Sequence, residues 1–174
     1  KDNLVVIVAG IGMLLSTLDT GIINVALPFF KSYFETTADI AAIAVTGYTI
    51  SLAVFILPFG LLSDKFGKLS FSYIGLIIFG LSSLLCGLSA NIQMLIMFRI
   101  FQGIGAAALQ ATSASLITTL VSAEKSSSAI GVLGIMIGVG PVLGPSLGGL
   151  LLSLNSWRGI FWLNIPFVLL GLIC

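Results

Sequence analysis

Two ionisable side chains of opposite charge, Asp19 and Arg99, lie inside long stretches of apolar and small residues, at 4–30 and 94–120. A charge at the centre of a bilayer costs roughly 3 kcal/mol on insertion scales, so an intramembrane ionisable residue usually has a function. Such side chains mark substrate, ion and proton pathways. The two residues together predict a transport protein.

The composition indicates a membrane protein. The 174 residues include 58% hydrophobic residues but only 7 basic and 6 acidic ones, and the mean hydropathy is +1.22. A net charge of +1 gives no electrostatic basis for binding nucleic acid. Because histidine is absent, imidazole metal sites and histidine-based nucleophile pairs are excluded, and carboxylates are left as proton carriers. We therefore expect no enzymatic activity, no metal and no cofactor.

Apolar stretches long enough to cross a bilayer follow one another along the chain. We expect an all-α membrane protein with six transmembrane helices. They are placed at about residues 4–30, 40–62, 69–88, 92–121, 129–154 and 159–174. The last stretch is short and has no closing polar flank, so we expect a truncated chain that forms the N-terminal bundle of a larger transporter. The basic residues of the short loops favour a cytoplasmic N-terminus.

The two intramembrane charges are expected at the same depth. Asp19 follows Leu4 by 15 residues, which is roughly 22 Å along a helix that enters from the cytoplasm. Arg99 follows Ile92 by 7 residues on a helix of opposite direction, roughly 10 Å from the outer edge. In a core about 30 Å thick both charges fall in the outer layer. We expect them to pair; separate snorkelling is easier for the long arginine than for an aspartate.

Polar and small residues share one side of the expected helix 92–121, since successive residues turn by 100°. They are Arg99, Gln102, Gly103, Ala106, Gln110 and Ser113. Such a face can line a cavity or pack against another helix. The amide of Gln110 favours a cavity, because an amide at that depth needs several partners or water.

The stretch 129–154 is rich in glycine and also holds two prolines. Gly140, Gly144 and Gly148 recur every fourth residue and form a ridge that permits close helix approach. Pro141 and Pro145 remove backbone donors and bend a helix. We expect this helix to form a moving seam between two bundles, because ordinary tight packing would not require both prolines.

Five segments resemble motifs of the major facilitator superfamily, in particular its 14-helix drug:proton antiporter branch. The segments are LDTGIINVALP at 18–28, GLLSDKFGK at 60–68, RIFQGIG at 99–105, GPVLGPSLGG at 140–149 and SWRGIFWLNIP at 156–166. The corresponding family patterns are LDxTIVNVALP, GxLaDrxGrk, RxxQGxG, gxxxGPxxGG and WRxIFxINIP. The segments occur in the family's order and cover the chain from end to end.

This resemblance implies proton-coupled efflux of hydrophobic, often cationic drugs or dyes by alternating access, in the plasma membrane with the N-terminus in the cytoplasm. Asp19 would bind the proton and a cationic substrate, and Arg99 would tune the proton affinity of Asp19. Residues of the first, second and fourth helices would line the substrate cavity. They are Asn24, Tyr48, Gln102, Gln110 and Ser113.

The resemblance also implies a cytoplasmic latch against the missing C-terminal half, in which the Asp64 carboxylate meets a helix N-terminus. The latch comprises Gly60, Asp64, Lys65, Gly67 and Lys68, and the antiporter motif comprises Gly140, Gly144, Pro145, Gly148 and Gly149. An ordinary polar turn with basic residues is the alternative to the latch. The expected partners are a small-molecule substrate, protons, the lipid bilayer and the missing half, with no nucleic acid.

Several positions depart from the family patterns. Ala111 stands where proline is frequent, and Ile43 and Gly159 stand where tryptophan is frequent. The substrate is therefore not inferred from the motifs. Two alternatives remain open at this point: an exporter or uptake carrier for a metabolite with the same fold, and a membrane scaffold without transport activity.

Overall fold

A computed structural model describes residues 2–120, 122–153, 161–162 and 164–173. The described part of the chain is helical and contains no strand. Its helices are α1 (Asp2–Tyr33), α2 (Ala38–Phe66), α3 (Lys68–Gly87), α4 (Ile92–Leu120), α5 (Ala123–Ser153) and α7 (Asn164–Ile173). Helices satisfy their backbone hydrogen bonds internally, which is what a segment surrounded by lipid requires. The prediction of an all-α membrane fold is confirmed.

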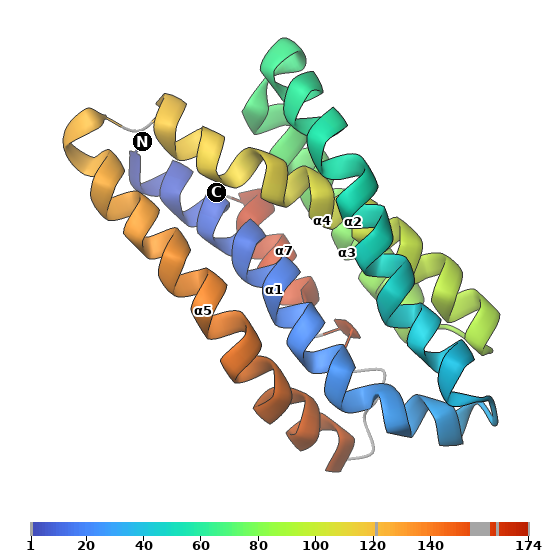
Figure 1. Cartoon of the computed structure of the whole chain (residues 1–174). Coiled ribbons are helices and arrows are strands. Elements are labelled where there is room, and N and C mark those ends of the chain that lie inside the picture. The colour runs from blue at the N-terminus through green and yellow to red at the C-terminus, as the bar shows by residue number, and fades with distance from the viewer. Residues whose placement is uncertain (1, 121, 154–160, 163, 174) are drawn as a thin grey trace.

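Helix α1 lies near the middle of the bundle (Figure 1). It packs along its length against α5 and also contacts α4, while α2 and α3 both pack against α4. Helix α7 contacts α3 and α1. The two helices that carry Asp19 and Arg99 therefore share an interface at the centre of the bundle.

Helices α1, α2 and α5 extend past the apolar stretches that predicted them. Helix α2 runs to Phe66 rather than Leu62, and α5 begins at Ala123 rather than at about Ala129. Exposed Glu124 and Lys125 occupy the additional first turn of α5. Hydropathy marks only the part of a helix that suits lipid, and helical hydrogen bonding continues beyond it into polar sequence.

Five of the described helices are long and apolar enough to cross a membrane. The candidate spans are Val5–Ile23, Ala38–Phe66, Lys68–Gly87, Ile92–Ser113 and Ser127–Leu150. The sixth predicted span, 159–174, falls partly outside the described residues; its described residues are 161–162 and those of α7. That span, and the arrangement of the chain as one half of a transporter, stay predictions.

A close contact joins α1 to α5. A β-carbon added to Gly144 would lie 2.8 Å from the backbone of Gly21, and one added to Gly148 would lie 3.2 Å from the carbonyl oxygen of Ile22. Glycine is required there because any side chain would separate the two backbones. The predicted glycine ridge thus packs against α1 within this bundle. Its role at a seam between two bundles stays a prediction.

The turn between α2 and α3 depends on one glycine. Gly67 has a φ of 107°, a region that favours glycine over residues with a β-carbon. Its backbone N–H donates to the carbonyl oxygen of Ser63 at 2.9 Å, which closes the end of α2. Helix α3 starts at the next residue, so the ends of α2 and α3 lie side by side.

Candidate functional site

The structure brings Asp19 of α1 and Arg99 of α4 together in the bundle interior. Nη1 of Arg99 donates to Oδ2 of Asp19. Asp19 is 1% exposed and Arg99 is 0% exposed, so both charges are fully inside the protein. A buried charge is tolerated only when it is paired and hydrogen-bonded. The predicted pairing of the two intramembrane charges is confirmed.

The guanidinium of Arg99 is also held by α2. Its Nε donates to the carbonyl oxygen of Ala44 at 3.0 Å, and its Cζ lies 4.2 Å from the centre of the Tyr48 ring. A guanidinium over an aromatic face gains a cation–π attraction, which is larger in a desolvated site. Its Nη2 has no hydrogen-bond partner among the described residues. Arg99 therefore connects α1, α2 and α4 and keeps one donor free.

Gln102 lies between the two charged groups. Its Oε1 accepts from Nη1 of Arg99 at 2.8 Å, and its Nε2 is 3.4 Å from Oδ1 of Asp19. The same Nε2 donates to Oγ of Ser83 on α3 at 2.7 Å, and Sγ of Cys86 lies 3.7 Å from Oε1. Gln102 is completely buried. The side chain predicted to line a cavity thus forms part of a packed polar network.

The polar network continues from Ser83 to α7. Nδ2 of Asn164 donates to Oγ of Ser83 at 3.3 Å. Both side chains are 0% exposed, and Oδ1 of Asn164 has no hydrogen-bond partner among the described residues. Neither residue is among the predicted site residues, although Asn164 lies in the motif segment at 156–166. A lone amide in the apolar stretch 161–173 was an available signal for Asn164, whereas serines are common in packed membrane helices.

A second set of polar contacts reaches α1 at Ser16. The Tyr48 hydroxyl donates to the carbonyl oxygen of Ser16 at 3.0 Å, and Nε2 of Gln110 donates to Oγ of Ser16 at 3.0 Å. Oγ of Ser113 instead donates to its own helix, at the carbonyl oxygen of Leu109, 2.6 Å away. Tyr48 and Gln110 therefore contact the helix that carries Asp19, and Ser113 is buried on the same helix as Gln110.

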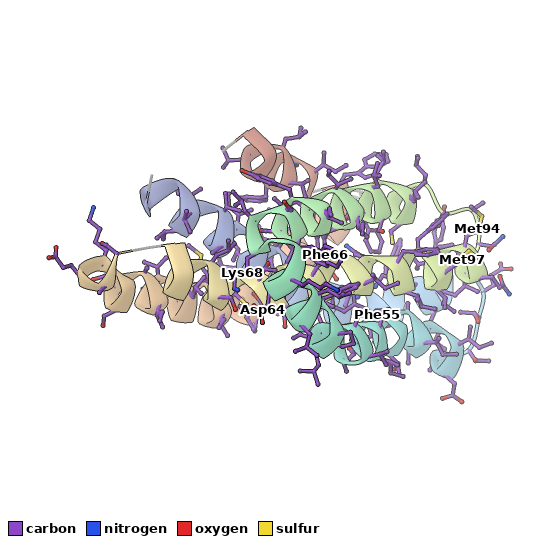
Figure 2. All side chains as sticks on the ribbon, turned by 90° about the horizontal axis from the view of Figure 1, so that it is seen from above. Phe55, Asp64, Phe66, Lys68, Met94 and Met97 are labelled. Atoms are coloured by element: carbon purple, nitrogen blue, oxygen red, sulfur yellow. The ribbon has the colours of Figure 1, made fainter. Side chains whose placement is uncertain are left out.

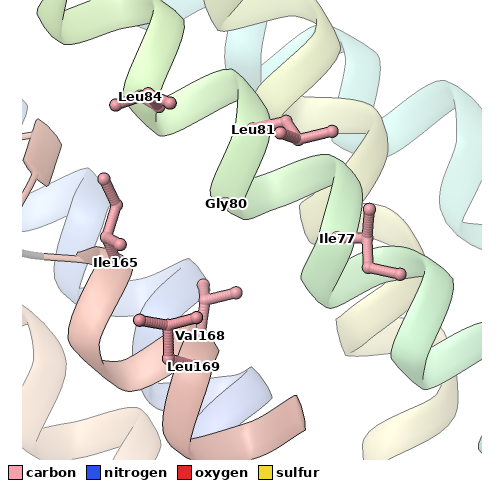
Figure 3. Close-up of a pocket in the computed structure, with 7 residues that line it drawn as sticks. All are labelled: Ile77, Gly80, Leu81, Leu84, Ile165, Val168 and Leu169. Carbon is pink, nitrogen blue, oxygen red and sulfur yellow. The ribbon is translucent and has the colours of Figure 1, made fainter.

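One predicted cavity residue, Asn24, lies outside those whose side chains the structure describes. An apolar pocket does occur between α3 and α7 (Figure 3). Its lining residues are Ile77, Gly80, Leu81, Leu84, Ile165, Val168 and Leu169. This pocket is separate from the predicted cavity residues and offers no polar group to a charged solute.

The predicted latch residues lie at the end of α2 and the start of α3. Nζ of Lys68 is 2.5 Å from Oδ1 of Asp64, and Figure 2 shows the two side chains next to each other. Lys65 lies over the Phe66 ring at 5.5 Å. A β-carbon on Gly60 would meet no atom within 4 Å, so this part of α2 is open. An exposed ion pair contributes less than about 1 kcal/mol, so Asp64 can exchange Lys68 for another partner at little cost.

Among the described residues, no group of three or more histidine, cysteine, aspartate or glutamate side chains could hold a metal ion. The side chains gathered at the site are one carboxylate, one guanidinium, one thiol and the amides and hydroxyls around them. Such a site can bind and release a proton, or exchange one cation for another.

The apolar spans and the buried ion pair define a multi-pass membrane protein built around an intramembrane charge site. The chain belongs to the Major Facilitator Superfamily, whose family description matches residues 9–174. The resemblance found in the sequence motifs is thereby confirmed at the level of the family.

Several curated proteins are similar in sequence. The chain is 37% identical over 163 residues to the riboflavin transporter RibZ of Clostridioides difficile (strain 630), covering 94% of this chain and 36% of RibZ. It is 37% identical over 164 residues to the multidrug resistance protein Stp of Mycobacterium tuberculosis (strain ATCC 25618 / H37Rv), covering 94% of this chain and 30% of Stp. It is 36% identical to the methylenomycin A resistance protein of Bacillus subtilis (strain 168), covering 93% of this chain and 35% of that protein.

Two solved structures share the fold. The proton:xylose symporter XylE bound to 6-bromo-6-deoxy-D-glucose matches with a TM-score of 0.84 and 19% identity, over 99% of this chain and 43% of XylE. A bacterial homologue of the human lysosomal transporter Spinster, in an inward-facing and occupied conformation, matches with a TM-score of 0.79 and 21% identity. The match covers 97% of this chain and 42% of the homologue. The chain spans about a third of the curated relatives and less than half of these solved chains. These relatives are transporters and resistance proteins, which agrees with the expectation that the chain is not an enzyme.

Proposed function

We propose that the chain is the N-terminal bundle of a proton-coupled antiporter that exports hydrophobic, often cationic compounds by alternating access. In this proposal Asp19 carries the proton and Arg99 is its regulator. The single observation that supports it best is the fully buried ion pair between α1 and α4. Asp19 and Arg99 are the charged residues of the apolar stretches that the structure describes, and a packed helix interface alone does not require either of them.

Proton binding at Asp19 would change the stability of the whole site. Protonation removes the negative charge that balances Arg99, and a buried cation without a counterion is destabilised by several kcal/mol. The guanidinium would then have to rely on Gln102, Ala44 and the Tyr48 ring, or the helices would have to move. A site whose two protonation states favour different arrangements can bias a transporter between two conformations. A cationic substrate would act on the same equilibrium by competing with Arg99 for the carboxylate.

Other predicted parts are included in this proposal. The bundle would lie in the plasma membrane with its N-terminus in the cytoplasm, so the α2–α3 turn would face the cytoplasm. Asp64 would exchange Lys68 for a helix N-terminus of the other half when the cytoplasmic side closes. The glycine and proline motif of α5 would allow α5 to adjust against its neighbours during the exchange.

The names of the relatives support drug export but do not point to one substrate class. Stp and the methylenomycin A resistance protein are resistance proteins, which favours export of toxic compounds. RibZ, by contrast, is a riboflavin transporter, so a metabolite carrier of the same fold is the second candidate function. Uptake and efflux of ethidium and of riboflavin, measured side by side in the same vesicles, would separate the two candidates.

The experiment that tests the proposal uses the complete polypeptide that carries this chain, reconstituted in lipid vesicles. We expect Asp19→Asn to abolish ethidium movement driven by a pH gradient. Asp39→Asn is the matched control, because it removes an exposed carboxylate in the first turn of α2. If Asp19→Asn still moves ethidium in response to the pH gradient as well as the Asp39→Asn control does, Asp19 is not the proton carrier.

A further inference from the structure

Asn164, the first residue of α7, has a buried amide that the proton mechanism described above does not use. Its side chain is 0% exposed, yet only its Nδ2 is hydrogen-bonded, to Oγ of Ser83. Its Oδ1 has no partner among the described residues. Buried polar groups are almost always hydrogen-bonded, so an exception needs a physical reason.

Ser83 links this amide to the charge site. Its Oγ accepts from two amides, Nδ2 of Asn164 at 3.3 Å and Nε2 of Gln102 at 2.7 Å. The Gln102 side chain then reaches both charges, with Nε2 near Asp19 and Oε1 on Arg99. A continuous hydrogen-bonded chain therefore runs from α7 through α3 and α4 to the carboxylate on α1.

The chemistry of the hydroxyl and the amide allows this hydrogen-bonded network a second arrangement. In the arrangement observed, Ser83 accepts from Asn164. A rotation of the Asn164 amide would bring Oδ1 to Ser83 in place of Nδ2, and the serine hydroxyl would then donate to it. A hydroxyl can take either role without moving its oxygen. The free Oδ1 of Asn164 is the acceptor that the second state needs.

We propose that Ser83 and Asn164 are positioning residues for proton exchange at Asp19, and this inference rests on the proposed function. They hold the Gln102 amide between the carboxylate and the guanidinium, and they connect the protonation state of Asp19 to α7. Neither residue touches the proton itself. The site residues that face Asp19 with titratable or charged groups are Arg99 from α4, Tyr48 from α2 and Cys86 from α3. The described parts of α5 and α7 that lie in the bundle, 127–153 and 164–173, carry no charged residue.

The test is a pH titration that needs no substrate. The complete polypeptide in lipid vesicles is followed by difference infrared spectroscopy, and the protonated carboxyl band of Asp19 is identified as the band that Asp19→Asn removes. We expect Ser83→Ala to change the midpoint of this band by about one pH unit, because the Gln102 amide beside the carboxylate loses the acceptor that holds it. Ser83→Thr keeps the hydroxyl and should restore the midpoint.

The matched control is Ser82→Ala, on the same helix and also buried at 4% exposure, but without a contact in the network. Asn164→Leu, which is similar in size, should move the midpoint in the same direction as Ser83→Ala. The double variant should move the midpoint no further than either single variant, because both residues act through the same hydrogen-bonded network. If Asn164→Leu does not fold, the comparison of Ser83→Ala with Ser82→Ala decides the matter alone.

The possible results are distinguishable. If the Asp19 band titrates with the same midpoint in the parent, Ser83→Ala, Asn164→Leu and Ser82→Ala, the positioning role is overturned. The proposed function is left standing by that result. A spectrum in which no titrating band disappears in Asp19→Asn would overturn the proposed function itself, and the positioning role with it.

Discussion

Replacing Gly144 by alanine tests the close contact between α1 and α5. A β-carbon at this position would lie 2.8 Å from Cα and the carbonyl carbon of Gly21 and from the backbone nitrogen of Ile22. All three atoms belong to the main chain of α1, so no side chain can turn aside to make room. The two helices would have to separate along the interface.

The expected cost follows from two opposing terms. Alanine in place of a helical glycine favours the folded state by roughly 0.5–1 kcal/mol, because it reduces backbone freedom in the unfolded chain. Overpacking a well-fitted interface costs about 1–3 kcal/mol. We therefore expect Gly144→Ala to be destabilising by about 1–2 kcal/mol net. Gly138→Ala, on the same helix but with no atom within 4 Å of the added β-carbon, should be neutral or slightly stabilising.

The assay is reversible unfolding of both variants in the same detergent micelles, followed by tryptophan fluorescence. Equal stability of Gly144→Ala and Gly138→Ala would refute the close packing of α1 on α5. If the contact also moves during transport, Gly144→Leu should slow substrate exchange more than it weakens substrate binding. Collapse of binding with normal turnover per bound substrate would instead place Gly144 in the substrate pocket.

Three further substitutions probe the polar sites. Arg99→Ala should destabilise the protein by about 3–5 kcal/mol, because it leaves the Asp19 carboxylate buried without a partner, and adding Asp19→Asn should recover part of that loss in the same unfolding assay. Tyr48→Phe keeps the ring over the guanidinium and removes one hydrogen bond to α1, so a loss of about 1 kcal/mol is expected, and an unchanged stability would contradict that bond. Asp64→Asn should change stability by less than about 0.5 kcal/mol yet slow transport, whereas Lys68→Gln should affect transport less; equal effects on transport would favour an ordinary turn over a latch.

The membrane fold was predictable because its signals are local. Apolar stretches predicted the helices. The number of residues between each helix start and its charge predicted that Asp19 and Arg99 lie in one layer of the membrane, and the structure confirms that they pair. The helix ends were less predictable, since α2 and α5 continue into polar sequence that hydropathy does not mark.

The neighbours of the ion pair could not be predicted from spacing alone. Gln102 was correctly placed on the face of Arg99, but its contacts with Ser83 and the link to Asn164 depend on how α3 and α7 pack, which one sequence does not specify. The i, i+4, i+8 ridge of α5 was predicted as a surface for close approach. Its partner in the described bundle, Gly21 of α1, is set by tertiary packing.

The central claim is that Asp19 exchanges its proton when substrate binds. The most direct measurement is proton release into weakly buffered solution when ethidium is added to the purified complete polypeptide in detergent, monitored with a pH indicator dye. We expect proton release from the parent and from the Asp39→Asn control, and none from Asp19→Asn even where ethidium still binds. Proton release from Asp19→Asn equal to that of the parent would show that Asp19 is not the group that releases the proton.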